Sequence, residues 1–319
     1  MTAVAHYNLL ERLGEGAFSE IWRARDTKFG RTVALRLIRD EAFIGANMRE
    51  AFLRDARAAA QLSHPNITTL FDVGEYEGGS YLAYEFAAGV NLRRESAGRP
   101  VNPRRAIELA VHIADALAEG HSRDLVHGDI RPETIFVTHK GSAKLLEFGM
   151  AHWTTGGRIR ERAAAAPDAL DADAIPVVSY MSPEQTRGGP VDPRTDIYSL
   201  ATVLYELLTG VNPFAGATAA TTVENVRAVV PRRPMAEGGS DELASLVRAA
   251  MSKEPAARPQ TAAAFAASLR AIGTILDVRA GEVPRTELLP IDDEPTSRWW
   301  VPLLVLLVLG VVLWWYLNR

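Results

Sequence analysis

The pattern of apolar residues changes once along this chain of 319 residues, and that change constrains its fold more than any other feature. Up to about residue 87, apolar and β-branched residues alternate in short runs, a pattern that predicts strands. One helical stretch, around residues 43–62, interrupts them. From Pro103 to Ile272 the apolar residues recur every three or four positions, which predicts helices. The order predicts an α+β chain with a β-rich part followed by a helical part.

Individual elements can be placed from the same patterns. The predicted strands are Tyr7–Leu13, Glu20–Arg25, Thr32–Ile38, Ile67–Val73, Tyr81–Phe86, and a hairpin-like pair at Ile135–Val137 and Ala143–Leu146. The segment Thr154–Ala174 is rich in Ala, Gly, Asp and Arg, and we predict a long mobile loop there. Residues 273–297 contain three prolines and few large apolar residues, which predicts a linker without a core of its own.

The most apolar segment is Trp299–Leu317, nineteen residues without a charge. At about 1.5 Å per residue, it roughly spans the ~30 Å hydrocarbon core of a bilayer. Aromatic residues at both of its ends match the aromatic belts of membrane helices. We predict one transmembrane helix over residues 298–318 that crosses the cell membrane once, with the part of the chain before it in the cytoplasm. The alternative is a buried core helix, which rarely has aromatic residues at both ends.

Composition excludes some functions. The net charge is −4, so a nucleic-acid partner is not expected, because such proteins normally carry a strongly basic surface. The chain has no cysteine, which excludes disulfides and thiolate metal sites.

Short motifs occur in a fixed order along the chain. They are Gly14-Glu15-Gly16, Val33-Ala34-Leu35-Arg36, His127-Gly128-Asp129, Glu147-Phe148-Gly149, Ser182-Pro183-Glu184, Asp196-Ile197-Tyr198-Ser199-Leu200 and Arg258-Pro259. The glycine motif alone could equally be an ordinary hairpin. A dinucleotide-binding fold is disfavoured, because its glycine motif opens a helix and here a strand follows. The ordered set resembles the Ser/Thr protein kinase family, particularly bacterial members with a C-terminal membrane helix.

The resemblance covers about residues 7–270 and implies a bilobal fold. Residues 1–87 would form a β-rich small lobe and residues 88–272 a helical large lobe, with ATP between them. Tyr84 would be the gatekeeper residue at the back of the cleft. The positions that match nucleotide-binding residues of the family are Leu13, Gly14, Gly16, Ile21, Ala34, Arg36, Glu85, Ala87 and Phe136. Plain core packing explains their apolar side chains equally well.

Other matches concern the scaffold and the catalytic loop. The resemblance implies that Glu184 and Arg258 form a buried ion pair, and that Asp196 holds the backbone of the catalytic loop. Asp129 matches the catalytic base, and Arg131 lies where the family has a catalytic-loop lysine.

Several positions depart from the family pattern. Arg36 replaces the lysine that contacts the ATP phosphates, and Asp55 replaces its glutamate partner. Thr134 and Glu147 replace the asparagine and aspartate that hold the metal ions. Mg²⁺ demands near-octahedral geometry at about 2.0–2.1 Å, so we expect Mg²⁺ or Mn²⁺ to bind poorly there. Gly128 replaces an arginine that reads a phosphorylated loop. Because Arg36 is longer than lysine and Asp55 shorter than glutamate, we hypothesise that the two still form an ion pair.

These departures predict a membrane-anchored pseudokinase that binds ATP weakly or not at all. It would act as a signalling scaffold or allosteric partner of cytosolic signalling proteins. One alternative is a slow but active Ser/Thr kinase, because Asp129 and Glu147 still supply two carboxylates. Another is an interaction protein whose cleft is empty.

Overall fold

The alternating pattern of the first part of the chain forms a six-stranded antiparallel sheet in the order β1-β2-β3-β4-β6-β5. The structure is a computed structural model, and it describes residues 3–16, 18–43, 46–153, 155–234 and 238–281. The strands are β1 (Ala3–Val4), β2 (Tyr7–Gly16), β3 (Ser19–Asp26), β4 (Arg31–Arg39), β5 (Leu70–Tyr76) and β6 (Gly79–Glu85). They agree with the predicted strands of this part to within a few residues at each end.

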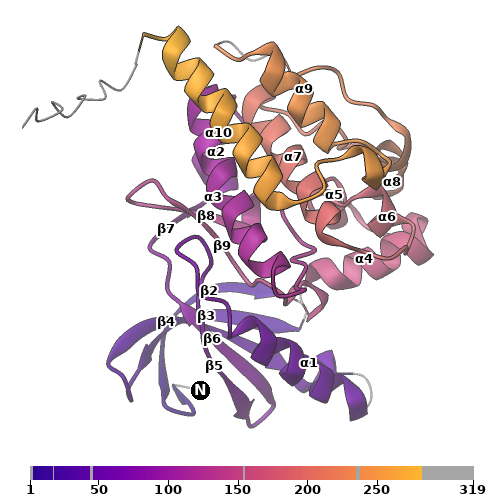
Figure 1. The fold of residues 1–319 in the computed structure, drawn as a ribbon. Coiled ribbons are helices and arrows are strands. Elements are labelled where there is room, and N and C mark those ends of the chain that lie inside the picture. The colour runs from indigo at the N-terminus through magenta and orange to yellow at the C-terminus, as the bar shows by residue number, and fades with distance from the viewer. Residues whose placement is uncertain (1–2, 17, 44–45, 154, 235–237, 282–319) are drawn as a thin grey trace, which may run out of the picture. The chain divides into compact units, whose positions relative to one another are not determined.

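Helix α1 (Ala46–Ala59) belongs to the same lobe as the sheet (Figure 1). Its Phe52 and Ala56 are fully buried in one cluster with Leu82 of β6 and Met150 of the large lobe. This spacing of four residues places both side chains on one face of the helix. Contacts from α1 therefore reach a segment that lies almost 100 residues further along the chain.

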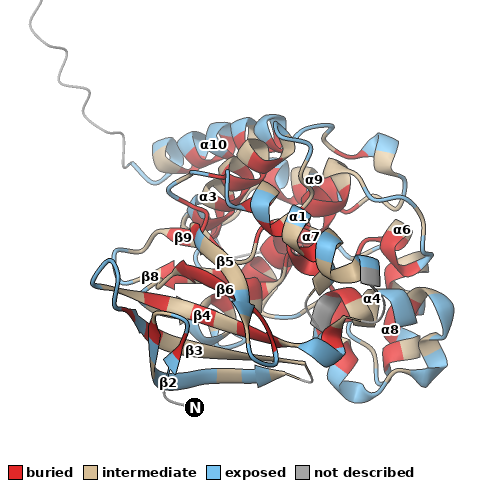
Figure 2. Ribbon diagram, turned by 90° about the horizontal axis from the view of Figure 1, so that it is seen from below, coloured by how far each residue is buried: buried red, intermediate tan, exposed pale blue. Residues whose placement is uncertain are grey.

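The large lobe is built around α3 and α7, whose apolar faces pack together. Ile107, Ile113 and Leu117 of α3 are almost completely buried in this core, and Figure 2 shows buried residues on both helices. The α-helices of this lobe are α2 (Leu92–Ser96), α3 (Pro103–His121), α4 (Thr155–Ala165), α5 (Ile175–Val178), α6 (Pro183–Thr186), α7 (Pro193–Thr209), α8 (Ala219–Ala228), α9 (Asp241–Ala250) and α10 (Ala262–Arg279). A small sheet, β7-β8-β9, faces the small lobe. Its strands are β7 (Gly89–Asn91), β8 (Ile135–Thr138) and β9 (Ala143–Leu145).

The segment predicted as a mobile loop, Thr154–Ala174, is instead largely helical in its described part. It contains α4 and two short 3₁₀ helices, Pro167–Ala169 and Ala172–Ala174. Alanine and arginine favour helix, and Ala163 is completely buried against α5 and α8. Composition suggested a loop because the segment has few large apolar residues, but small alanines are sufficient for close helix packing.

The end of the helical part also differs from the prediction. Helix α10 continues to Arg279, past residue 272, where we had predicted that the large lobe ends and the linker follows. Leu276 extends the buried face of α10, which explains the extra turns. Residues Met1–Asp277 form one compact unit and Val278–Arg319 a second. In the described part of the chain no helix combines the length and the apolar character needed to cross a membrane, and the predicted span 298–318 lies outside that part.

Candidate functional site

A cavity of about 290 Å³ lies between the two lobes. Ile21, Ala34 and Arg36 of β3 and β4 line it from the small lobe, and Phe136 of β8 lines it from the large lobe. Its lining residues are Leu13, Ile21, Ala34, Arg36, Thr68, Tyr84, Glu85, Phe86, Ala87, Asn91, Glu133, Phe136, Leu146 and Glu147. Seven of the nine predicted nucleotide positions are therefore brought together. Gly14 and Gly16 lie on β2 beside it without lining it.

Five lining residues were missed by the sequence reading: Thr68, Phe86, Asn91, Glu133 and Leu146. Three of them are sequence neighbours of predicted positions. Phe86 lies between Glu85 and Ala87, Glu133 precedes Thr134, and Leu146 precedes Glu147. Adjacency to a motif was thus the signal that could have found them. Thr68 and Asn91 lie outside the motifs and reach the cavity only through the tertiary fold.

Arg36 and Glu147 form an ion pair at the edge of this cavity. The Arg36 Nη1 also donates a hydrogen bond to the Ser19 hydroxyl at 3.1 Å. Only 12% of the Arg36 side chain and 16% of the Glu147 side chain are exposed, so solvent screens the pair weakly. Glu147 has a backbone φ of +56°, a left-handed conformation that costs a non-glycine residue about 1–3 kcal/mol.

The hypothesised Arg36–Asp55 ion pair is wrong. Among the described residues the two side chains have different partners. The Asp55 carboxylate accepts a hydrogen bond from the indole N–H of Trp153 at 3.0 Å, and within the described residues it is ion-paired with the neighbouring Arg54. Length compensation along the sequence could not reveal that Glu147 lies closer to Arg36, because that proximity arises only when the two lobes meet.

The catalytic loop holds Asp129 in a network of charges. The Arg131 Nε donates to the Asp129 carboxylate at 2.9 Å, and its Nη1 donates to Glu133 at 3.1 Å. Burial lowers the pKa of the Arg131 guanidinium, but these two carboxylates outweigh burial and raise it overall. Arg93 of α2 donates to Glu133 at 2.9 Å and extends the network away from the cleft. Arg131 therefore stays protonated beside Asp129.

Thr134 has an internal role in this loop. Its hydroxyl donates to the backbone carbonyl of Asp129 at 2.8 Å and accepts the N–H of Arg131 at 3.1 Å. The residue is 7% exposed. A hydroxyl has one proton and two lone pairs, so these bonds leave it little capacity for another ligand. Thr134 therefore braces the loop, and its side chain does not line the cavity.

Two buried groups support the loop from below. The Asp196 carboxylate accepts the backbone N–H groups of His127 and Gly128, both at 2.8 Å, and contacts His121. His127 accepts the Asp129 N–H at its Nδ1, so its Nε2 carries the proton and donates to the Leu146 carbonyl at 2.8 Å. Asp129 and Leu146 are thus linked through one imidazole.

Phe148 packs edge-on against His127, with ring centres 5.3 Å apart. Its other neighbour is Gly120 of α3, where an added Cβ would lie 2.0 Å from the Phe148 Cζ. Gly120 is the penultimate residue of α3, so its cost relative to alanine is at most the roughly 0.5–1 kcal/mol found in a helix interior. The absence of a Cβ at Gly120 leaves the space in which the Phe148 ring sits. Phe148 in turn positions the neighbouring Glu147.

Glu184 and Arg258 form an ion pair with two hydrogen bonds, of 2.7 and 2.8 Å. The Arg258 side chain is fully buried. Burial raises the pKa of Glu184, but the hydrogen bonds and charge of Arg258 outweigh it and lower that pKa overall. Glu184 lies in α6, and Arg258 follows the last 3₁₀ helix, Pro255–Ala257, so the pair joins segments more than 70 residues apart.

The backbone conformation and the surroundings of Gly128 account for a glycine where the family has an arginine. Gly128 has a φ of +76°, and a Cβ added to it would lie 3.3 Å from the Nη1 of Arg160. A guanidinium from α4 therefore lies beside the place where the family has an arginine side chain. Both the backbone conformation and the neighbouring helix favour glycine at this position.

Two polar atoms beside the cavity are buried and have no hydrogen-bond partner among the described residues, the Tyr84 hydroxyl and the Nε of Arg36. Burial raises the pKa of Tyr84, and the Glu147 carboxylate adds to the rise. Unsatisfied buried groups are costly and concentrate at functional sites. The unpaired Tyr84 hydroxyl and Arg36 Nε therefore indicate that this end of the cleft has a functional role.

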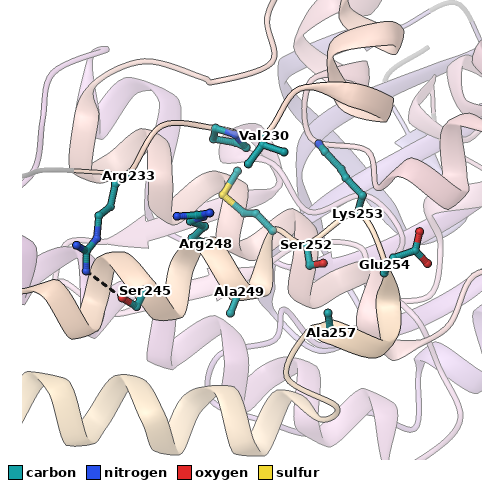
Figure 3. A pocket seen from close by; sticks show the side chains of 11 residues that line it. Val230, Arg233, Ser245, Arg248, Ala249, Ser252, Lys253, Glu254 and Ala257 are labelled. Carbon is teal, nitrogen blue, oxygen red and sulfur yellow. Dashed lines mark hydrogen bonds between the residues drawn. The ribbon is translucent and has the colours of Figure 1, made fainter.

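A larger cavity of about 770 Å³ lies on the large lobe between the segment after α8, helix α9 and the last 3₁₀ helix (Figure 3). Two of the cations that line it, Arg233 and Lys253, are already engaged. Arg233 donates to the Ser245 hydroxyl at 3.0 Å, and Lys253 donates to the Val226 carbonyl at 2.7 Å. Burial lowers the pKa of Lys253 to about 8, and nearby arginines add to the effect. None of the predicted site residues lines this cavity, so the inter-lobe cavity is the stronger candidate.

A small β-lobe and a helical lobe that enclose a cleft, with a carboxylate on a loop below it, define the protein-kinase class. The sequence pattern described as "Protein kinase domain" matches residues 7–269. The chain therefore belongs to the protein kinase family. Within it, the chain is similar to bacterial Ser/Thr kinases.

Two relatives and one solved structure illustrate the similarity. "Serine/threonine-protein kinase PknB" of Mycolicibacterium smegmatis is 36% identical over 301 residues, which cover 91% of this chain and 46% of that protein. PknB of Mycobacterium tuberculosis is 35% identical over 311 residues, covering 93% and 47%. This chain thus spans about half the length of these relatives. The crystal structure of the Mycobacterium tuberculosis PknI kinase domain has a TM-score of 0.62 at 22% identity, covering 84% of this chain and 97% of that one, which shows the shared fold.

Proposed function

We propose that this protein is a kinase-fold nucleotide-binding protein in which phosphoryl transfer is lost or strongly reduced. The ion pair between Arg36 and Glu147 carries the proposal. Active members of the family use a lysine to contact ATP phosphates and an aspartate to hold Mg²⁺. In this chain the residues at both positions neutralise each other, so neither is poised for phosphate or metal.

The metal position supports the same conclusion. Mg²⁺ needs oxygen ligands in a near-ideal octahedron. The Glu147 carboxylate already has a cationic partner, and the Thr134 hydroxyl is engaged within its own loop. The residues therefore do not fit the family's metal ions, and we derive no step through them.

A second candidate is a slow Ser/Thr kinase, and Asp129 favours it. Its carboxylate keeps a cation, Arg131, at 2.9 Å, as an acceptor-activating base in this family requires. In this reading Asp129 takes the proton of a protein hydroxyl while Arg131 holds the carboxylate in place. Loss of even two transition-state contacts of about 2.7–4 kcal/mol each would reduce its rate by roughly four orders of magnitude.

Thermal unfolding of the full chain in mild detergent separates these readings. Stabilisation by ATP that is the same with EDTA and with Mg²⁺ is the result that the proposal expects. Stabilisation only with Mg²⁺ or Mn²⁺, together with phosphate transfer to protein that disappears in Asp129→Asn, would establish the slow kinase instead. Asp129→Asn preserves size and removes the charge. Absence of any shift at millimolar ATP would leave a scaffold with an empty cleft and refute nucleotide binding.

We further propose that residues 298–318 anchor the protein in the cell membrane and that the kinase-like unit recruits cytosolic signalling proteins there. The uncharged run Trp299–Leu317 supports the anchor. Fractionation of the full chain and of a chain ending at residue 297 tests it. Recovery of both from the soluble fraction would refute the anchor.

A further inference from the structure

Helix α4 connects the two lobes. On the large-lobe side Ala163 is completely buried in a cluster with Val177 and Val223. On the small-lobe side the guanidinium of Arg158 lies 3.6 Å from the ring centre of Phe18, a cation–π contact. The same guanidinium donates to the backbone carbonyl of Ala42 at 3.0 Å. These contacts hold Arg158 at a defined place beside the small lobe.

That place is the glycine-rich turn above the cleft. Phe18 lies between β2, which ends at Gly16, and β3, which begins at Ser19. Ser19 in turn accepts a hydrogen bond from Arg36, which lines the cavity. In the kinase fold this turn covers the phosphates of a bound nucleotide. Arg158 is therefore attached to the turn that covers the phosphates in the kinase fold, and its side chain lies outside the lining of the cavity itself.

The charge balance around the turn distinguishes Arg158 from the other cations. Arg36 is paired with Glu147, and Arg131 is paired with Asp129. In the described part of the structure no carboxylate lies within ion-pair distance of Arg158. Among the described residues its guanidinium contacts a ring face and a carbonyl, and neither neutralises it. Arg158 thus contributes an uncompensated positive charge at this turn.

We propose that Arg158 is an anion-binding residue of the nucleotide cleft. It would donate hydrogen bonds to the phosphate oxygens of a nucleoside di- or triphosphate, and so supply charge that a lysine and metal ions supply elsewhere in the family. A guanidinium suits this role, because its planar fork matches two phosphate oxygens. The contact with Phe18 orders the side chain beforehand, which reduces the entropy lost on binding. This inference rests on the proposed nucleotide binding and names the residue that recognises the phosphates.

The test is calorimetric binding of adenosine, ADP and ATP to the full chain in detergent with EDTA present. The wild-type protein should bind ATP about tenfold or more tightly than adenosine, since one hydrogen bond between charged groups has that effect. Arg158→Gln should abolish most of this preference and leave adenosine binding unchanged. Arg158→Lys, which keeps the charge but loses the fork, should retain part of it.

Arg162→Gln is the matched control. Arg162 lies one turn further along α4, is exposed, and donates to the Ala169 carbonyl. Arg162→Gln removes the same charge from the same helix but leaves Arg158 in place, so the preference for ATP over adenosine should survive. Equal weakening of adenosine and ATP by Arg158→Gln would show that the residue only clamps α4 to the small lobe. An unchanged ATP preference would also overturn the inference. If adenosine and ATP both fail to bind the wild-type chain, the proposed function itself is wrong.

Discussion

The Arg36 guanidinium and the Glu147 carboxylate are ion-paired, although they come from different lobes and lie more than 100 residues apart in the chain. In active kinases the corresponding residues engage ATP phosphate and metal. The pair thus connects β4 to the segment that leads into α4, while Asp55 of α1, which replaces the family's glutamate partner, is engaged by Trp153. The substitutions at these positions act together, and their consequences can be measured.

A double-mutant cycle tests the ion pair. Arg36→Met and Glu147→Gln should each lower the free energy of unfolding, and the double mutant should show a coupling of about 0.5–3 kcal/mol, as contacting residues do. The control cycle combines Arg36→Met with Asp55→Asn, whose effects should add within about 0.3–0.5 kcal/mol. Urea unfolding provides both values. Additive effects in the first cycle would contradict the ion pair.

Gly120→Ala should be destabilising although it lies in the last turn of α3, and alanine is preferred over glycine in a helix by up to about 1 kcal/mol. The new Cβ would lie 2.0 Å from the Phe148 Cζ, and overpacking of this kind costs about 1–3 kcal/mol. Phe148→Leu added to Gly120→Ala should recover part of the loss, because the shorter side chain vacates that space. If Gly120→Ala proves as stable as the wild type, Phe148 is not seated against α3.

Restoring the family's ligands should create metal dependence. The triple variant Arg36→Lys, Thr134→Asn, Glu147→Asp replaces the ion pair and the engaged hydroxyl by the residues that hold ATP and Mg²⁺ in active kinases. At ligand about 100-fold above its Kd, binding stabilises the fold by about 2.7 kcal/mol. We expect MgATP to stabilise the variant more than ATP with EDTA does. The wild-type chain, measured in parallel, should show no such difference.

The Glu184–Arg258 pair should make stability depend on pH in the acidic range. The pKa of Glu184 is lowered in the folded state, so its contribution is complete above the ordinary value of 4.5 and is lost as the pH falls through the folded-state pKa. Glu184→Gln leaves Arg258 buried without its partner, a change that costs about 3–5 kcal/mol. The difference in unfolding free energy between wild type and Glu184→Gln should therefore be large at pH 7 and shrink below about pH 4.5. A difference independent of pH would assign the loss to packing.

Much of the architecture follows from local sequence pattern. Period-two alternation placed the strands of the small lobe, and three- and four-residue spacing placed α3 and α7, because each pattern puts apolar side chains on one face of its element. The segment Thr154–Ala174 shows the limit of this reasoning. Its small residues gave no amphipathic signal, and the fit of Ala163 against α5 and α8 is what packs one face of α4 onto the large lobe.

The sequence by itself determined the family, the two-lobed fold and the residue types at each motif position, because these depend on order and periodicity along the chain. Only the tertiary structure decided the partners. It paired Arg36 with Glu147 and left Asp55 to Trp153, and it brought Arg158 to Phe18. A charged side chain interacts with whichever group lies within a few ångströms, and that distance depends on how the lobes and α4 pack rather than on separation along the sequence.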